Sequence, residues 1–213
     1  MDTKNNQKKV SVIIPCFNQG GFVEDAVLSA VNQTYKNIEI ICINDASTDN
    51  SSSVLKKLAD TYRNIVFFDE KENRGVIYAR NLGISAATGD YILPLDADNK
   101  IERTFIEKTV EVLEKNPDIG VVCSKVKIFG EENKNWNLSE PELKNILYSN
   151  NVDNCALFRK SDFLEIGGYK EYMQDGYEDW DLWLSFLENG FKFHQIDEFL
   201  FNYRQYKEES RTS

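Results

Sequence analysis

The sequence of 213 residues contains little histidine, cysteine or proline: one, four and four residues respectively. With a single histidine, His194, and no CxxC pair, the chain lacks the usual ligand set of a structural zinc site. Each cysteine stands in an apolar run, so we expect buried, reduced thiols, which are typical of a cytoplasmic protein. The four are Cys16, Cys42, Cys123 and Cys155.

Long apolar runs and excess positive charge are also missing. No apolar run reaches the roughly 18 residues that a membrane-spanning helix needs. The polar start, residues 1–9, has no signal-peptide core, and we expect a disordered leader there. With 35 acidic and 25 basic residues, the net charge of −10 argues against binding nucleic acid through its phosphates. We expect a cytoplasmic protein, with peripheral attachment to the inner face of the membrane left open.

Short apolar segments alternate with amphipathic ones along the first 130 residues. Hydrophobic residues make up 41% of the chain, which is typical of a globular protein. Alternating strands and helices predict an α/β fold with a mostly parallel sheet flanked by helices. We expect strands at 10–14, 38–43, 65–68, 91–95 and 120–129, and helices at 23–31, 51–62, 77–87 and 106–113.

The pattern changes after about residue 131. Residues 131–151 are polar and indicate a loop with at most a short helix. Further on we expect a short strand at 154–159, a helical turn at 160–166, a helix at 179–189 and strand material at 191–204. No flexible linker separates the two parts. We therefore expect one domain, 10–213, in which a smaller half, 131–213, packs on 10–130.

Polar residues follow three of the predicted strands. These are the segments Cys16-Phe-Asn18, Asn44-Asp45 and Asp96-Ala-Asp98. In a parallel sheet the carboxyl ends of the strands share one edge, and ligands bind there. The sequence thus predicts a binding site at that edge.

Two interpretations remain open for the polar groups at this edge. Asp96 and Asp98 suit a hard divalent cation, but Asp is also common in turns. The guanidinium of Arg80 matches a diphosphate, or it forms an ion pair on a helix surface.

The segment Glu178-Asp179-Trp180-Asp181 also allows two interpretations. Acidic residues in a first helical turn complement the helix dipole. One of them is alternatively a general base that removes a hydroxyl proton. Trp180 is either core or an apolar wall against which a sugar stacks.

Taken in order, these motifs resemble those of glycosyltransferase family 2. The resemblance rests on Val10 to Asn18, Ile43 to Asp49, Asn73-Arg-Gly, Ala79 to Gly83, Gly89 to Asp98, Gly167-Gly168 and Glu178-Asp179, and covers about residues 9–204. It implies a GT-A fold of Rossmann type and an inverting transferase. The donor would be a nucleotide-diphosphate sugar, most commonly linked to UDP, and the acceptor a saccharide or lipid-linked hydroxyl.

The resemblance implies a role for each matching residue in the donor half, 10–130. Pro15, Phe17 and Asn18 would flank the nucleotide base, and Asp45 would bind it. Arg80 would lie near the nucleotide. Asp96 and Asp98 would hold Mn²⁺ or Mg²⁺, with Asp98 the more direct ligand.

In the acceptor half, 131–213, the resemblance implies that Asp179 is the catalytic base. Glu178 and Trp180 would lie on the acceptor side. The implied activity is a single sugar transfer in the synthesis of a surface polysaccharide or glycolipid. Two alternatives stay open: a non-catalytic module that binds a nucleotide sugar, and a sugar-nucleotide pyrophosphorylase.

The chain departs from the family pattern at several positions. Asn44-Asp45-Ala46-Ser47 stands where Asp-Asp-Gly-Ser is common. The DxD motif of the family corresponds to Asp96-Ala97-Asp98, and Asn99 replaces an acid that often follows it. No histidine follows Tyr203-Arg204, which weakens the case for a third protein ligand to the metal and leaves open whether one exists. A QxxRW string is missing as well, which argues against a processive synthase.

Overall fold

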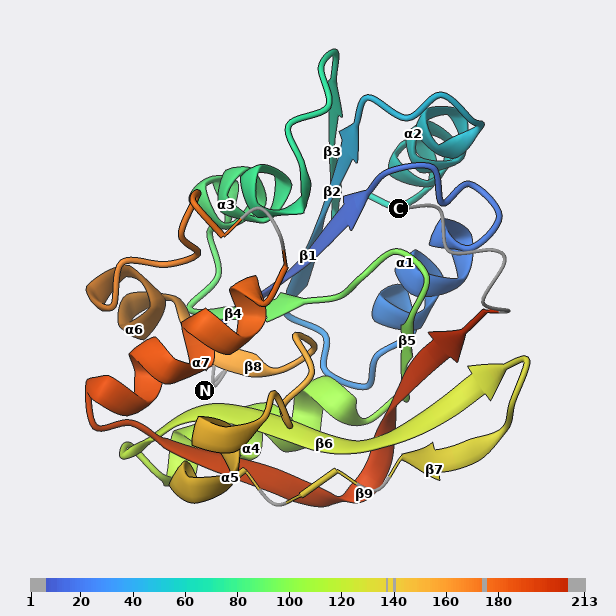
Figure 1. Cartoon of the computed structure of the whole chain (residues 1–213). Coiled ribbons are helices and arrows are strands. Elements are labelled where there is room, and N and C mark those ends of the chain that lie inside the picture. The colour runs from blue at the N-terminus through green and yellow to red at the C-terminus, as the bar shows by residue number, and fades with distance from the viewer. Residues whose placement is uncertain (1–6, 137, 140, 174–175, 207–213) are drawn as a thin grey trace, which may run out of the picture.

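The structure, a computed structural model, describes residues 7–136, 138–139, 141–173 and 176–206. Within these residues one twisted sheet carries the strands in the order β3-β2-β1-β4-β8-β6-β9-β5, and β7 pairs with β6 (Figure 1). The carboxyl ends of β1, β2 and β4 share one edge because these neighbours run parallel. That edge is where the candidate site forms.

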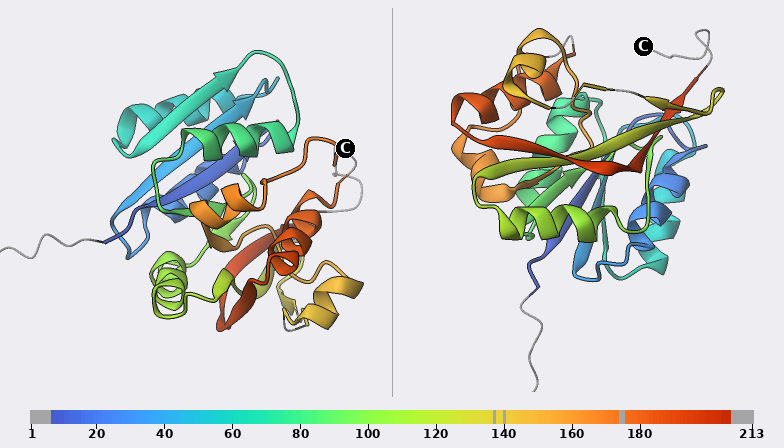
Figure 2. Two further views of the ribbon diagram at one scale, coloured as in Figure 1. Left: turned by 90° about the vertical axis from the view of Figure 1, so that its left-hand side faces the viewer. Right: turned by 90° about the horizontal axis from the view of Figure 1, so that it is seen from below.

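The first part of the chain builds the parallel half of the sheet. β1, β2, β3 and β4 are parallel neighbours, and the helices between them cover both faces (Figure 2). The elements are β1 (Val10–Cys16), α1 (Val23–Val31), β2 (Ile38–Asp45), α2 (Ser51–Thr61), β3 (Ile65–Glu70), α3 (Val76–Ala86), β4 (Tyr91–Pro94), β5 (Lys100–Ile101) and α4 (Phe105–Lys115).

The remaining elements extend the sheet with mixed strand directions. β8 lies antiparallel between β4 and β6, while β6 and β9 are long parallel neighbours that curl across the molecule. The elements are β6 (Ile119–Gly130), β7 (Lys134–Trp136), α5 (Leu143–Tyr148), β8 (Leu157–Arg159), α6 (Lys160–Glu165), α7 (Glu178–Glu188) and β9 (Lys192–Gln205).

Two hydrophobic clusters fix the helices to the sheet. Alternate residues of β1 point to opposite faces, so Val12 and Ile14 join α1, α2 and α4 while Ile13 joins α3, α6 and α7. Helix α3 approaches the sheet closely, since a Cβ at Gly83 would come within 2.6 Å of Ile13 Cγ2. This contact packs the second half of α3 closely against the middle of β1.

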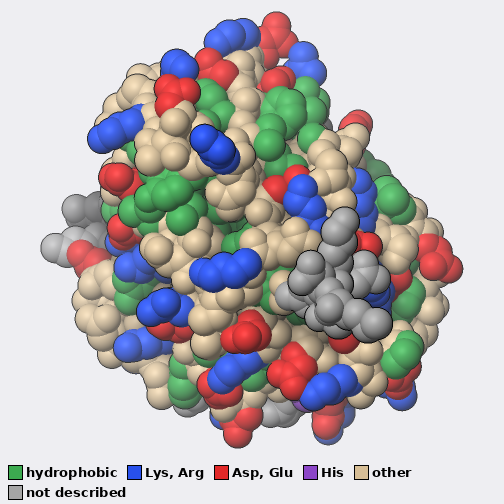
Figure 3. Space-filling view, turned by 180° about the vertical axis from the view of Figure 1, so that it is seen from behind, with side chains coloured by type: hydrophobic (Ala, Val, Ile, Leu, Met, Phe, Trp, Pro, Cys, Tyr) green, Lys and Arg blue, Asp and Glu red, His purple; other side chains and the backbone are tan. Residues whose placement is uncertain are grey.

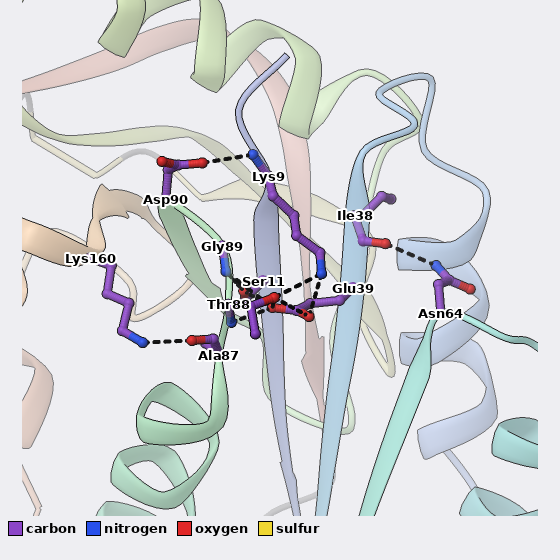
Figure 4. Close-up of polar contacts among 10 residues, drawn as sticks. All are labelled: Lys9, Ser11, Ile38, Glu39, Asn64, Ala87, Thr88, Gly89, Asp90 and Lys160. Atoms are coloured by element: carbon purple, nitrogen blue, oxygen red, sulfur yellow. Dashed lines mark hydrogen bonds and ion pairs between the residues drawn. The ribbon is translucent and has the colours of Figure 1, made fainter. Parts of the chain in front are cut away.

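A polar cluster closes the opposite edge of the sheet, at the amino ends of the strands. The carboxylate of Glu39 accepts hydrogen bonds from Lys9 Nζ, Ser11 Oγ and the Thr88 backbone N–H at 2.6–2.7 Å (Figure 4). A Cβ at Gly89 would lie 2.5 Å from Ser11 Oγ, so a larger residue would break the cluster. The cluster joins β1, β2 and the segment before β4 far from the candidate site.

Most predicted elements are present, with differences at their ends and in the second half. The mostly parallel α/β architecture is confirmed, and α1 spans the predicted 23–31. The polar stretch 131–151 contains α5 and also β7, which alternation did not predict because all three residues of β7 are exposed. The two-residue strand β5 was not predicted either.

The start of the described chain is hydrogen-bonded to the segment before β4. Residues 1–6 of the expected leader lie outside the described residues, whereas Lys9 donates its backbone N–H to Asp90. All four cysteines are buried, as expected. Side chains of both charges are spread over the face in Figure 3. Among the described residues, no helix is long and apolar enough to cross a membrane.

Candidate functional site

Two tight backbone turns close the end of β1 against the end of β2. Asn18 and Ala46 both adopt left-handed backbone conformations, with φ of 52° and 56°. The Asn18 N–H donates to Ser47 Oγ at 3.0 Å, and Asn18 Oδ1 accepts from the Thr48 N–H at 2.8 Å. Asn18 thus ties the two loops together. Neighbouring Phe17 is 46% exposed, so its ring is available for a flat ligand.

Asp45 fixes the loop that precedes α3. Its two carboxylate oxygens accept from the backbone N–H groups of Arg74 and Gly75 at 2.9 and 2.8 Å. Asn73 donates to the Asp45 carbonyl oxygen at 3.2 Å. Each carboxylate oxygen has a second lone pair, so Asp45 can still accept from a ligand. The backbone of the loop before α3 therefore orients Asp45, the residue that is expected to bind the base.

Arg80 is the centre of the polar contacts between the two halves of the sheet. Its guanidinium lies on α3, is only 4% exposed, and forms ion pairs with Asp96 at 2.8 Å and Glu178 at 2.5 Å. The Tyr169 ring lies 5.6 Å away. Burial lowers the pKa of Arg80, but the charges of Asp96, Tyr169 and Glu178 raise it above the ordinary value. Arg80 is thus a fixed positive charge.

Asn154 completes the surroundings of this guanidinium. When its amide oxygen faces Arg80, it lies 3.1 Å from Nη2 and 3.2 Å from Nε, and its nitrogen donates to the Tyr169 hydroxyl. Each of the three guanidinium nitrogens then has an acceptor within hydrogen-bond distance. A buried cation needs such partners, because an unpaired charge would be costly.

Two further carboxylates lie near Arg80. Burial raises the pKa of Asp179, although Asn150 Nδ2 and the Trp180 N–H each donate to it at 2.8 Å. Burial also raises the pKa of Asp153 to about 7, and the charge of Asp96 acts in the same direction. A carboxyl with a raised pKa is a better proton acceptor than an ordinary one.

Asp98 lies beside the end of β9. Its Oδ2 accepts from the Tyr206 hydroxyl at 2.9 Å, and its carbonyl oxygen accepts from Arg204 Nε at 2.8 Å. Burial raises the pKa of Asp98, and the charge of Asp96 adds to this. The DxD segment is thus linked to α3 by the ion pair between Asp96 and Arg80, and to the end of β9 by the hydrogen bonds of Asp98.

The structure brings most of the predicted site residues together at one edge. Arg80 forms direct ion pairs with both Asp96 and Glu178. The acidic segment after β4 and the acidic start of α7, which were interpreted separately above, therefore meet at one guanidinium. Pro15 is buried within β1. Trp180 is half-buried and donates its indole N–H to the Ile146 carbonyl at 2.7 Å. Trp183, one turn later, is fully buried core.

Sequence reasoning missed several residues of this edge. Asp153, Asn154 and Tyr206 lie in segments without a recognisable motif, and Tyr169 directly follows the Gly167-Gly168 motif but was given no role. Each contacts or faces a predicted residue from a distant part of the chain; Tyr206 and Asp98, for example, are 108 positions apart. No local pattern could have indicated them.

A cavity of about 540 Å³ opens between the start of α3 and the segment before α7. Arg74, Tyr78 and Glu178 line it together with Met173. The Arg74 guanidinium lies 4.8 Å from the centre of the Tyr78 ring. The cavity adjoins the Arg80 ion pairs through Glu178 and the Asp45 loop through Gly75, so it is continuous with the site.

The donor set at this edge suits a divalent cation only in part. Within the described ranges, no group of three or more His, Cys, Asp or Glu side chains could hold a metal ion. Two carboxylates, Asp96 and Asp98, are nevertheless the usual protein contribution to a Mg²⁺ or Mn²⁺ site that shares its ion with substrate phosphates. The residues therefore fit a cation that is completed by water and a diphosphate.

Comparison with known proteins identifies the family. Residues 11–175 match the family model described as Glycosyl transferase family 2. This chain belongs to that family. The Bacillus subtilis minor teichoic acid biosynthesis protein GgaB is 30% identical over 220 residues, which cover 96% of this chain and 24% of GgaB. The chain spans less than half the length of the first curated relatives that it matches, with 38%, 44% and 16% covered.

Solved structures support the GT-A fold of this family 2 chain. Staphylococcus aureus TarS 1-349 in complex with UDP aligns with a TM-score of 0.78 at 19% identity, over 92% of this chain and 60% of that one. The Pyrobaculum calidifontis mannosyltransferase PcManGT, in complex with GDP-Man and Mn²⁺, aligns with a TM-score of 0.74 at 20% identity. The alignment covers 96% of this chain and 59% of PcManGT.

Proposed function

We propose that this chain is the catalytic part of an inverting glycosyltransferase. It moves one sugar from a nucleoside-diphosphate sugar to a hydroxyl group of a growing surface glycan or lipid-linked saccharide. The observation that carries the proposal is the ion-pair chain Asp96–Arg80–Glu178, which joins the DxD segment to the start of α7. It holds the donor-side acids and Asp179 on one rigid frame.

The donor would lie across the carboxyl ends of β1, β2 and β4. Phe17 would contact the base, while Asp45 would accept a hydrogen bond from it. Pro15 at the end of β1 and Asn18 in the following loop would flank the base, and Arg80 would stabilise the acids near the diphosphate. We propose UDP as the nucleotide because the TarS structure holds UDP, and GDP is the alternative because PcManGT holds GDP-Man.

Asp96 and Asp98 would hold Mn²⁺ or Mg²⁺ at the diphosphate. When bound, such an ion neutralises the charge that develops on the leaving nucleoside diphosphate. Asp179 would take the proton of the acceptor hydroxyl as that oxygen attacks the anomeric carbon from the face opposite the leaving group. Glu178 and Trp180 would orient the acceptor. A single displacement of this kind inverts the anomeric centre.

The acceptor is proposed as a surface polymer because GgaB is named for the synthesis of minor teichoic acid. We further propose that residues 10–130 form the donor half and 131–213 the acceptor half of one domain. Peripheral attachment to a membrane would follow if the acceptor is linked to a lipid.

A thermal-unfolding panel tests the proposal. UDP, GDP, CDP and TDP are each added with and without Mn²⁺ to wild type and Asp98→Ala. A ligand at 100 times its Kd stabilises by roughly 2.7 kcal/mol, which gives a clear rise in Tm. We expect one nucleotide to stabilise wild type more with Mn²⁺, and Asp98→Ala to lose the metal effect. Stabilisation by none of the four would contradict the proposal.

A further inference from the structure

The end of β9 lies directly beside the DxD segment. The Tyr206 hydroxyl donates to Asp98 Oδ2 at 2.9 Å, although 108 positions separate the two residues. Tyr206 comes one residue after β9 ends, and its ring contacts Phe22 at the start of α1. The residue that follows the last strand thereby completes the surroundings of an acid in the donor half.

The Tyr206 ring is held by a second contact. It packs edge-on against Phe22 with ring centres 5.4 Å apart. Phe22 immediately precedes α1 and also lies 4.5 Å from the Arg204 guanidinium. The ring orientation is therefore set by α1, independently of the hydroxyl contact.

Arg204 anchors the same stretch of backbone. The backbone N–H of Arg204 donates to Asn99 Oδ1, and its side-chain Nε donates to the Asp98 carbonyl oxygen, both at 2.8 Å. The guanidinium is sandwiched between Phe22 and Phe129, at 4.5 and 4.4 Å. Two bonds to the Asp98–Asn99 loop thus hold Tyr206 in reach of the carboxylate.

A hydroxyl donor can orient a carboxylate that ligates a metal. A carboxylate has about four lone-pair positions, so Asp98 can accept from Tyr206 and still bind a cation. Partners of this kind fix the direction of the ligand, and their loss typically weakens metal binding 10- to 100-fold. The effect matters most where the protein supplies few ligands, as Asp96 and Asp98 do here.

We propose that Tyr206 is a positioning residue that orients the Asp98 carboxylate toward a divalent cation. This inference rests on the proposed function, because it takes Asp98 as the metal ligand. It assigns a role to the end of β9. The chain has no histidine after Tyr203-Arg204, and Tyr206 is the residue there that contacts Asp98. The Asp98 carboxylate would be pre-oriented by the fold before any substrate binds.

The Tyr206→Phe variant tests the proposal, because it keeps the ring on Phe22 and removes only the hydroxyl. The probe is Mn²⁺ alone, titrated into the full chain while the electron paramagnetic resonance signal of free Mn²⁺ is recorded. We expect Tyr206→Phe to bind Mn²⁺ about 10- to 100-fold more weakly than wild type while it stays folded at the assay temperature, which its Tm verifies. Tyr148→Phe is the matched control, since Tyr148 is 89% exposed on α5, and we expect wild-type affinity.

A second variant, Phe22→Leu, removes the edge contact that holds the ring. We expect it to weaken Mn²⁺ binding in the same direction, by less than Tyr206→Phe. If Tyr206→Phe binds Mn²⁺ as tightly as wild type, or more tightly, the inference is overturned while the transferase proposal stands. If Asp98→Ala binds Mn²⁺ like wild type, both the inference and the metal role of Asp98 fail. The nucleotide panel without metal then still tests the transferase.

Discussion

Arg80 and Glu178 lie 98 positions apart in the chain, yet their side chains form a partly buried ion pair at 2.5 Å. Arg80 lies on α3 in the first half, and Glu178 begins α7 in the second. The same guanidinium also binds Asp96, after β4. A single side chain therefore sets the separation between the DxD segment and the proposed catalytic base next to Glu178.

Replacing Arg80 by methionine should destabilise the protein strongly. The variant leaves the carboxylates of Asp96 and Glu178 without their buried cation. Losing one partner of a fully buried pair costs about 3–5 kcal/mol, and we expect a smaller loss here because Asp96 is 35% exposed. Urea unfolding at neutral pH measures the change. Lys56→Met is the control, because Lys56 pairs with Asp60 on the exposed surface of α2 and should change stability by less than about 0.5 kcal/mol. Equal effects of the two substitutions would contradict the role of Arg80.

Asp179→Asn should abolish most turnover and leave nucleotide binding intact. The amide keeps the shape and, with its oxygen toward Asn150, that hydrogen bond, although it loses the one from the Trp180 N–H. It cannot take a proton, and a general base contributes roughly 10²–10⁴-fold. Release of nucleoside diphosphate in the presence of an acceptor measures turnover, and the Tm shift with the nucleotide measures binding. Glu188→Gln, at the exposed end of the same helix, should retain full activity. An active Asp179→Asn variant would remove Asp179 from the proposed mechanism.

Ala46→Gly should stabilise the protein. Ala46 has a φ of 56°, a left-handed conformation that costs an L-residue with a Cβ roughly 1–2 kcal/mol, and glycine avoids that cost. Glycine also loses more entropy on folding, so we expect a net gain of about 0.5–1 kcal/mol. Urea unfolding measures it. Ala59→Gly, inside α2, should lower stability by about 0.5–1 kcal/mol, and a loss of stability in Ala46→Gly would show that the turn is not strained.

Glu39 should make folding stability depend on pH in the acidic range. Burial alone would raise its pKa, but hydrogen bonds from Lys9, Ser11 and Thr88 lower it from 4.5 to about 2. A carboxyl with a lowered pKa stabilises the fold fully above its unfolded pKa, so this contribution is lost as the pH falls from 4.5 toward 2. Unfolding by urea over this pH range measures the loss.

The Glu39→Gln variant gives the matched comparison. We expect it to be less stable than wild type at neutral pH, and the difference should shrink as the pH falls through the same window. Glu24→Gln, on the surface of α1, should follow the wild-type pH dependence. A constant difference between Glu39→Gln and wild type at every pH would mean that the charge of Glu39 contributes nothing.

The sequence by itself determined the alternating elements and the edge at which the site forms. Apolar runs such as 38–43 and the helical spacing over 23–31 depend only on neighbours in the chain, so they predicted β2 and α1 directly. The polar ends of β1, β2 and β4 indicated one edge, because parallel strands end together.

Only the tertiary structure decided which of these polar groups meet and in what way. Arg80 finds its partners 16 and 98 positions away, and Asp98 is bonded to Tyr206 across 108 positions. Even the strand order was hidden, since β8 enters between β4 and β6 from a later part of the chain. A local pattern carries no information about such contacts, because they arise from how the two hydrophobic clusters pack the helices and strands in space.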